Sequence, residues 1–158
     1  MKLYLVQHGE ALAKAENTER PLSLKGHQDC VTIAAFLSSS KVRVDEVAHS
    51  GKLRAEQTAF VLAKAVCPDQ APVKLAGLGP NDNTSPVFDG AEIAGGDLML
   101  VGHMPFMEHM LNRCLLANET GFAVNFEPGS VACLERTNDD SGENKWALSW
   151  MVRPSLLF

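Results

Sequence analysis

The sequence predicts an α/β fold, a three-layer α/β/α sandwich around a mixed, mostly parallel sheet. Short apolar, β-prone runs alternate with segments of helical spacing through about two-thirds of the chain, a pattern typical of parallel strands joined by helices. The rest of the chain has two apolar or alternating runs on either side of a turn-rich segment, which predicts a hairpin that adds an antiparallel edge. At 158 residues we expect a single domain over residues 1–158.

Six runs are predicted to be strands, because each is apolar or alternating and is bounded by polar or turn-forming residues. The runs are residues 2–7, 46–49, 73–76, 97–101, 130–136 and 145–152. The turn of the hairpin is expected at residues 137–144. Trp146 and Trp150 lie an even number of residues apart in the last run, so we expect both on one face of that strand, packed in the core.

Four segments have the spacing of amphipathic helices. The first follows Ser23, a favourable N-cap, and is expected to end at residues 38–40. The second spans residues 53–66, and Pro68 closes it. The expected apolar stripes are Val31, Ala34 and Ala35 on the first helix and Leu53, Phe60, Val61 and Ala65 on the second.

The third predicted helix follows a loop, and the fourth begins at a proline. A stretch rich in Gly, Pro and Asn, residues 77–86, predicts a loop, and a short helix is expected after it at residues 87–94. The fourth helix begins at Pro105, a residue that the first helical turn tolerates, and continues to residue 116.

Composition and charge limit the classes of function. The formal net charge of −5 argues against a general nucleic-acid binder, because the phosphate backbone would be repelled. No apolar run approaches the length needed to span a bilayer, and the N-terminal run is too short for a signal peptide. The four cysteines form no metal-binding pattern and suit buried thiols in a reducing compartment. We expect a cytoplasmic monomer with no nucleic-acid or membrane partner.

Residues that could bind a ligand or take part in catalysis follow three of the predicted strands. Gln7, His8 and Gly9 end the first strand, residues 50–54 follow the second, and Gly102 and His103 follow the fourth. In an open α/β sheet, ligands bind beyond the carboxyl ends of the strands. The sequence therefore predicts that these segments meet at one site.

The residue types at these positions suit phosphoryl chemistry. A neutral imidazole such as that of His8 attacks phosphorus once its other ring nitrogen is held protonated by a hydrogen bond. His103 can bond a phosphoryl oxygen as charge builds in the transition state, and the guanidinium of Arg54 or Arg20 can hold phosphate through two parallel bonds. Each residue taken alone has an ordinary structural explanation, and the case depends on their combination.

The combination resembles the histidine phosphatase superfamily, which has the phosphoglycerate mutase-like fold. The similar strings are LVQHGEA at residues 5–11, RPLS at residues 20–23 with Gly26, SGKLRAEQT at residues 50–58 and VGHMP at residues 101–105. The short chain and the LRAEQT string are most similar to the branch of SixA-type phosphohistidine phosphatases, and WMVRPSL at residues 150–156 also fits that branch.

The resemblance implies a role for each of these residues. His8 would become phosphorylated, Arg54 and His103 would hold the transferring phosphoryl group, and Gly9 and Gly102 would shape the pocket. No metal and no cofactor are implied, because the family stabilises charge with cationic side chains and backbone donors. The implied partner is a phosphotransfer protein that bears phosphohistidine, or a small phosphate ester.

One position departs from the family pattern. The motif usually has an arginine immediately before the nucleophilic histidine, and here that residue is Gln7. Losing one charge-assisted hydrogen bond to the transition state would cost about 1.5–3 kcal/mol, which slows an enzyme without abolishing its activity. Arg20 is the candidate for partial replacement, because the loop that carries it is expected to fold back over the His8 turn.

The general acid is not fixed by any motif. Asp82, in the loop after the third strand, and Glu10, two residues after the nucleophile, are the candidates. A phosphohistidine substrate reduces the need for an acid, because an imidazole whose other nitrogen is protonated leaves as a neutral molecule. The short chain leaves little room for a lid, which favours an open site and a substrate presented on a protein surface.

Two other functions stay open at this point. One is a small-molecule phosphomonoesterase with the same chemistry, and the other, motivated by Gln7, is a non-catalytic phosphate-binding module. The remaining histidines, His27, His49 and His109, are interpreted as structural or exposed.

Overall fold

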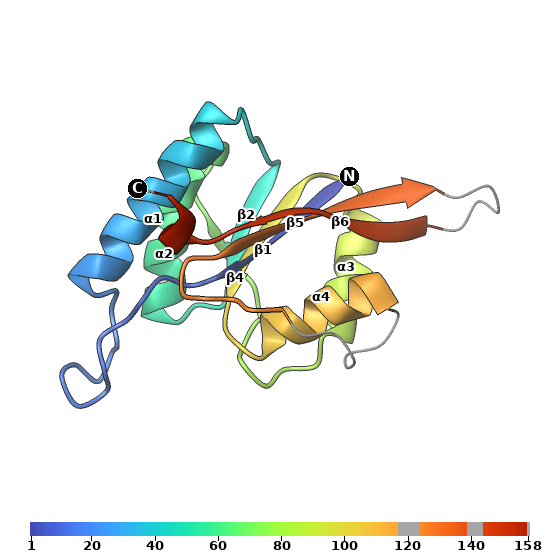
Figure 1. Cartoon of the computed structure of the whole chain (residues 1–158). Helices are drawn as coiled ribbons and strands as arrows, with labels where there is room; N and C mark the ends of the chain where they lie inside the picture. The colour runs from blue at the N-terminus through green and yellow to red at the C-terminus, as the bar shows by residue number, and fades with distance from the viewer. Residues whose placement is uncertain (117–123, 139–143, 158) are drawn as a thin grey trace.

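A computed structural model of the chain describes residues 1–116, 124–138 and 144–157. The chain forms a six-stranded sheet with helices on both faces (Figure 1). In chain order the elements are β1 Lys2–Gln7, α1 Leu24–Ser39, β2 Glu46–His49, α2 Leu53–Val66, β3 Val73–Lys74, α3 Ser85–Ala94, β4 Leu98–Gly102, α4 Phe106–Leu116, β5 Val131–Asn138, β6 Asn144–Val152 and the 3₁₀ turn η1 Pro154–Leu156.

The sheet is mixed, as predicted. Its strand order is β3-β2-β4-β1-β5-β6. The first four strands in this order pair in parallel, whereas β1 pairs antiparallel with β5 and β5 antiparallel with β6. The predicted three-layer α/β/α architecture is therefore confirmed. The tip of the hairpin predicted within residues 137–144 lies mostly outside the described residues.

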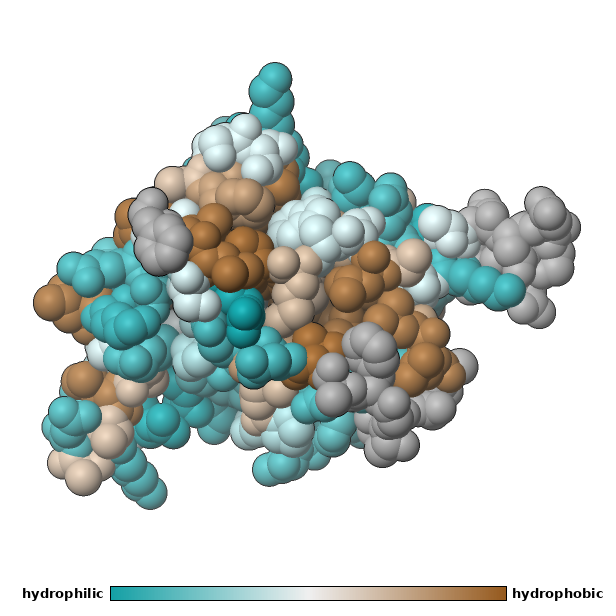
Figure 2. Space-filling view, in the orientation of Figure 1, coloured by the Kyte–Doolittle hydropathy of each residue, from teal (hydrophilic) through white to brown (hydrophobic). Residues whose placement is uncertain are grey.

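Two hydrophobic clusters bury the two faces of the sheet. Alternate residues of β1 divide between them: Tyr4 and Val6 face α1 and α2, whereas Leu3 and Leu5 face α3 and α4. Hydrophobic residues gather in the middle of the face seen in Figure 2, and hydrophilic residues lie mostly along its margins. None of the helices in the described part of the chain is long and apolar enough to cross a membrane.

The predicted apolar stripes of the first two helices are wrong. Helix α1 buries Cys30, Ile33 and Leu37, whereas Val31 is 48% exposed. Helix α2 buries the stripe Ala55, Thr58, Ala59, Leu62, Ala63 and Val66, and Phe60 is exposed. Both helices share one hydrophobic cluster with the sheet, and they pack against each other. On α2 the alanines of the inner face permit this close approach, and the large side chain of Phe60 lies outside.

The two tryptophans lie on opposite faces of the sheet, not on one face as predicted. Trp146 packs in the cluster under α4, whereas Trp150 contacts Tyr4 and Phe36 on the α1 side, with ring centroids 6.0 and 6.2 Å apart. The cause is an irregularity in the β5–β6 pairing, in which Cys133 pairs with Trp150 but the next residue, Leu134, pairs with Leu148. One extra residue in β6 reverses the alternation of its side chains.

The remaining boundaries differ by small amounts. Strand β3 has two residues where four are predicted, β4 begins one residue later, and α3 begins at Ser85 with a proline in its first turn. Helix α4 begins at Phe106, one residue after Pro105. The four cysteines are buried free thiols.

Candidate active site

The site lies at the carboxyl ends of three neighbouring parallel strands. Because β4 lies between β1 and β2, the residues that follow these strands converge at one edge of the sheet. The backbone N–H of His8 donates to the carbonyl of Gly102 at 3.0 Å, and the N–H of Ser50 donates to that of Val101 at 3.2 Å. The sheet itself therefore positions His8, Ser50 and His103 beside one another.

His8 has one ring nitrogen fixed and one facing a cation. Its Nδ1 lies 2.7 Å from the carbonyl oxygen of Gly9. A carbonyl only accepts, so Nδ1 carries the proton and Nε2 carries the lone pair. Arg54 donates from Nε to this Nε2 at 3.1 Å. The geometry thus leaves Nε2 as the ring nitrogen of His8 that carries the lone pair, a choice that the sequence alone leaves open.

The turn after β1 is braced by α2 and α1. The Gly9 N–H donates to Thr58 Oγ1 at 3.0 Å, and the same hydroxyl donates to the carbonyl of Arg54 at 2.8 Å. A side chain at Gly9 would place a Cβ 2.7 Å from the Cys30 sulfur, so only glycine permits this approach to α1. Thr58 therefore links the His8 turn to the helix turn that carries Arg54.

Thr58 lies in the string at residues 50–58 that resembles the family, but no role was predicted for it. A polar residue buried in a helix, one turn after Arg54, is the signal that would have pointed to it. A buried hydroxyl in a helix interior needs a partner, and here it has three, the Gly9 N–H, the Arg54 carbonyl and the Cys30 thiol.

His103 is buried beside His8. His103 is 2% exposed. The centroids of the two imidazole rings lie 4.9 Å apart, and the angle between the ring planes is 60°. The Nε2 atom of His103 lies 2.7 Å from Ser50 Oγ. The preceding Gly102 packs tightly, because a Cβ there would lie 2.5 Å from the Met107 methyl carbon and 3.1 Å from the Leu78 carbonyl.

Both imidazoles are neutral at physiological pH. Burial is the main cause that lowers the pKa of His8 to about 4, and Arg54 and Arg20 lower it further against the raising effect of the Gly9 carbonyl. Burial also lowers the pKa of His103 to about 3, with His8 and the cations Arg54, Lys52 and Arg20 acting in the same direction. A neutral His8 keeps its nucleophilic lone pair, and the surrounding cations favour an anionic ligand.

Arg20 adds a second positive charge near the histidines, whereas Gln7 is neutral. Arg20 has a left-handed backbone, with φ of 50°, and its Nε donates to the Leu12 carbonyl at 3.1 Å. Its charge lowers the pKa of Arg54 as well as those of the two histidines, which places it within electrostatic reach of all three. Gln7 Oε1 is buried and has no hydrogen-bond partner within residues 1–116, 124–138 and 144–157.

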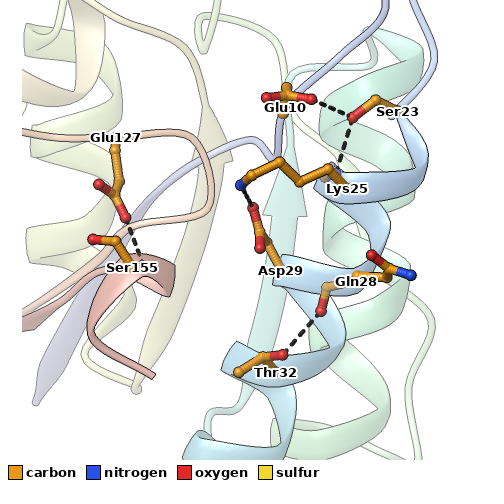
Figure 3. Close-up of polar contacts among 9 residues, drawn as sticks. Glu10, Ser23, Lys25, Gln28, Asp29, Thr32, Glu127 and Ser155 are labelled. Carbon is orange, nitrogen blue, oxygen red and sulfur yellow. Dashed lines mark hydrogen bonds and ion pairs between the residues drawn. The ribbon is translucent and has the colours of Figure 1, made fainter. Parts of the chain in front are cut away.

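The two carboxylates considered as general acids bond elsewhere. Glu10 is exposed, and its Oε1 accepts from the hydroxyl of Ser23, the N-cap of α1, at 2.7 Å (Figure 3). Asp82 is exposed and its Oδ2 accepts from the Gly79 N–H at 2.8 Å within its own loop. The structure thus brings His8, Arg54 and His103 together, with Arg20 within electrostatic reach of them. The side-chain hydrogen bonds of Glu10 and Asp82 instead stabilise a helix start and a turn.

The other three histidines make no side-chain contact with His8, Arg54 or His103 among the hydrogen bonds described, and one of them accepts from a backbone N–H of the loop after β2. His27 is exposed on α1, and His109 is half-buried on α4. His49 is buried, and its Nδ1 accepts from the Gly51 N–H at 3.1 Å. Among the described residues, no group of three or more His, Cys, Asp or Glu side chains is placed to hold a metal ion.

The lowered pKa values predict a pH-dependent stability. As the pH falls below 6.5, the ordinary value, the unfolded chain protonates its histidines while the folded chain holds His8 and His103 neutral to about 4 and about 3. The unfolded state then binds more protons, so the free energy of unfolding falls as the pH drops from 6.5 toward 4. Urea unfolding at about pH 7 and about pH 5 measures this. The free energy of unfolding should change less with pH in His103→Gln than in the native chain, and as much as in the native chain in His27→Gln. An equal pH dependence in all three proteins would contradict the prediction.

Comparison with known proteins agrees with the fold. No family model matches the chain. It is 25% identical over 154 residues to the phosphohistidine phosphatase SixA of Escherichia coli, covering 94% of each chain. It is 28% identical over 138 residues to an uncharacterized protein of Picosynechococcus, covering 83% of this chain and 82% of the relative.

Solved structures show the same architecture. A structure of the protein histidine phosphatase SixA complexed with tungstate superposes with a TM-score of 0.80, at 25% identity over 99% of both chains. A phosphoserine phosphatase of Entamoeba histolytica gives a TM-score of 0.71 over 99% of both chains, but at 14% identity it shows the fold alone. In sequence and in fold, the chain is similar to the SixA phosphohistidine phosphatases of the histidine phosphatase superfamily.

Proposed function

We propose that this chain is a phosphohistidine phosphatase that acts on a phosphotransfer protein through a phosphorylated His8. The observation that carries the proposal is the state of His8: its Nδ1 proton is held by Gly9, and its Nε2 lone pair faces Arg54 beside a second buried imidazole. A neutral, oriented nucleophile next to cationic and N–H donors is what transfer of a phosphoryl group requires.

The chemistry proceeds in two displacements. His8 Nε2 forms a bond to phosphorus as the bond between phosphorus and the substrate imidazole nitrogen breaks, and that nitrogen keeps the electron pair. With its other ring nitrogen protonated, the substrate imidazole leaves as a neutral molecule. Water then attacks phospho-His8, its proton passes to the phosphate oxygens or to solvent, and the P–Nε2 bond breaks to return neutral His8.

Each charge of the transferring group has a counterpart in the site. Arg54 reaches Nε2 of His8 with its Nε, so its guanidinium borders the position that phosphorus would occupy. Arg20 adds a second positive charge within electrostatic reach of the histidines. These cations stabilise the equatorial oxygens, whose negative charge persists through the transition state.

Two features support a phosphohistidine substrate over an alkyl ester. An alkoxide leaving group needs a general acid, yet Glu10 and Asp82 bond to Ser23 and Gly79 in the structure. We further propose an open site, because the cavities of about 650 and 550 Å³ lie elsewhere and His8, Arg54 and His103 line neither of them. An open site admits an imidazole that projects from the surface of another protein. The protein class of the partner and a cytoplasmic location are parts of this proposal.

Hydrolysis of two substrates tests the proposal. We expect the chain to remove phosphate from a phosphorylated phosphotransfer domain faster than from glycerol 2-phosphate, because the alkoxide of this alkyl ester must be protonated by a general acid as it leaves. Release of inorganic phosphate measures both reactions, and His27→Gln, an exposed change on α1, serves as a control that leaves both unchanged.

The other outcomes separate the competing functions. Faster turnover of the ester would assign a small-molecule phosphomonoesterase. Binding of orthophosphate without turnover of either substrate would assign a phosphate-binding module and would point to Gln7 as the cause.

A further inference from the structure

Ser50 connects the strand ends to the buried His103. It follows β2, and its N–H donates to the carbonyl of Val101 in β4, so its backbone is fixed between the two strands. Its Oγ lies 2.7 Å from His103 Nε2 and accepts a hydrogen bond from the Lys52 N–H at 3.3 Å. The position of the hydroxyl relative to the imidazole is therefore determined by the backbone on both sides.

The proton inventory of this pair favours one tautomer of His103. A serine hydroxyl has one proton to donate and two lone pairs to accept. With Lys52 on one lone pair, the hydroxyl uses its proton by donating to Nε2, which must then be unprotonated. In the opposite tautomer Nε2–H donates to Ser50, and the hydroxyl proton has no acceptor in the described part of the chain. Since His103 is neutral, the first arrangement places its proton on Nδ1.

Nδ1 of His103 lies at the end of the series of hydrogen bonds that runs from the Lys52 N–H through Ser50 to the imidazole. It is buried and has no hydrogen-bond partner among the residues that the structure describes. A buried N–H without an acceptor is unfavourable, and an oxygen of a bound ligand would relieve this. His8, 4.9 Å away between ring centroids, and the cations Arg54, Lys52 and Arg20, which lower the pKa of His103, make an anionic oxygen the fitting acceptor.

We propose that Ser50 is a positioning residue that holds His103 in its Nδ1–H tautomer, so that Nδ1 donates a hydrogen bond to a phosphoryl oxygen of the substrate. The identity of the acceptor rests on the proposed function, whereas the tautomer is a property of the ligand-free protein. Ser50 touches His103 and not the substrate, so it acts through the imidazole.

Nitrogen NMR of the imidazoles tests the tautomer directly. Two-bond ¹H–¹⁵N correlation spectra at about pH 7, where His103 is neutral, distinguish a protonated Nδ1 from a protonated Nε2. His103→Gln assigns the signals by removing them. We expect the Nδ1–H form in the unsubstituted protein and in Ser50→Thr, which keeps the hydroxyl, and a shift toward Nε2–H in Ser50→Ala.

Orthophosphate affinity measures the consequence. Titration calorimetry with orthophosphate should show binding about tenfold weaker in Ser50→Ala, the equivalent of one weakened hydrogen bond to a charged group, and close to unchanged in Ser50→Thr. Ser149→Ala, which removes an exposed hydroxyl from β6, is the matched control and should change neither tautomer nor affinity.

The results can overturn the inference in three ways. A protonated Nε2 in the unsubstituted protein, an unchanged tautomer in Ser50→Ala, or a changed tautomer with unchanged phosphate affinity would each reject it. If Ser50→Ala does not fold, Ser50→Cys supplies a weaker donor of similar size for the same comparison. Failure of phosphohistidine hydrolysis with the expected NMR result would reject the proposed function and leave the role of Ser50 intact.

Discussion

His8→Gln is expected to lower phosphohistidine hydrolysis by roughly 10³-fold or more, because it removes the atom that forms the bond to phosphorus. Glutamine keeps a polar side chain of similar length at the end of β1 but has no nucleophilic nitrogen. The Nε2 lone pair that faces Arg54 in the native chain is lost with the imidazole. Turnover of a phosphorylated phosphotransfer domain measures the rate, and transfer of labelled phosphate to the chain measures the intermediate.

The labelled intermediate distinguishes a lost nucleophile from a lost fold. The unsubstituted protein and His27→Gln should both carry label on His8, whereas His8→Gln should carry none and yet keep its urea midpoint near that of the native chain. Labelling of the His8→Gln chain, or a rate within about tenfold of the native one, would show that another residue attacks phosphorus.

The convergence of the site residues was predictable because it depends on topology alone. Each of His8, Ser50 and His103 follows a strand that the apolar pattern identifies, and parallel strands bring their carboxyl ends to one edge. The prediction needs no side-chain detail: it needs the strands, their direction and the helices between them. For the same reason the layer architecture followed from the order of the elements.

The inner faces of the helices were not predictable in the same way. On α1 the sequence offers Val31 as readily as Ile33 for burial, and the structure exposes Val31 and buries Ile33. On α2 the inner face uses alanines, which allow close packing but contribute little to an apolar pattern. The faces of Trp146 and Trp150 depended on a single extra residue in β6, which periodicity cannot locate.

The hydrogen bonds that support the site residues could not be predicted from the sequence either. The bond between Ser50 and His103 joins residues 53 positions apart, and that between Gly9 and Thr58 joins residues 49 apart. Such contacts depend on packing to within an ångström, whereas strand and helix patterns fix positions only to the level of an element. The Gly9–Thr58 bond holds the turn whose carbonyl faces Nδ1 of His8, and the Ser50–His103 bond is the basis of the tautomer proposed for His103.

Arg54→Ala is expected to lower turnover by about 10²- to 10⁴-fold, the range for losing two charge-assisted bonds to the transferring group. The effect should be large because Gln7 supplies no charge where the family pattern has an arginine, which leaves Arg54 and Arg20 as the arginines whose charge acts on His8. Arg54→Lys keeps the charge but not the fork of donors, and should lose about tenfold to a hundredfold.

The pKa of His8 provides a second readout that a loss of stability would not produce. Arg54 lowers this pKa, so its removal should raise the pKa of His8 from about 4 and move the acid limb of the pH–rate profile upward. Arg43→Ala, whose guanidinium bonds to the carbonyls of Val42 and Ala65 at the other end of the sheet, controls for loss of an arginine and should shift nothing. A rise in KM with kcat unchanged would show that Arg54 binds substrate and transition state equally, and would exclude the catalytic role assigned to its guanidinium.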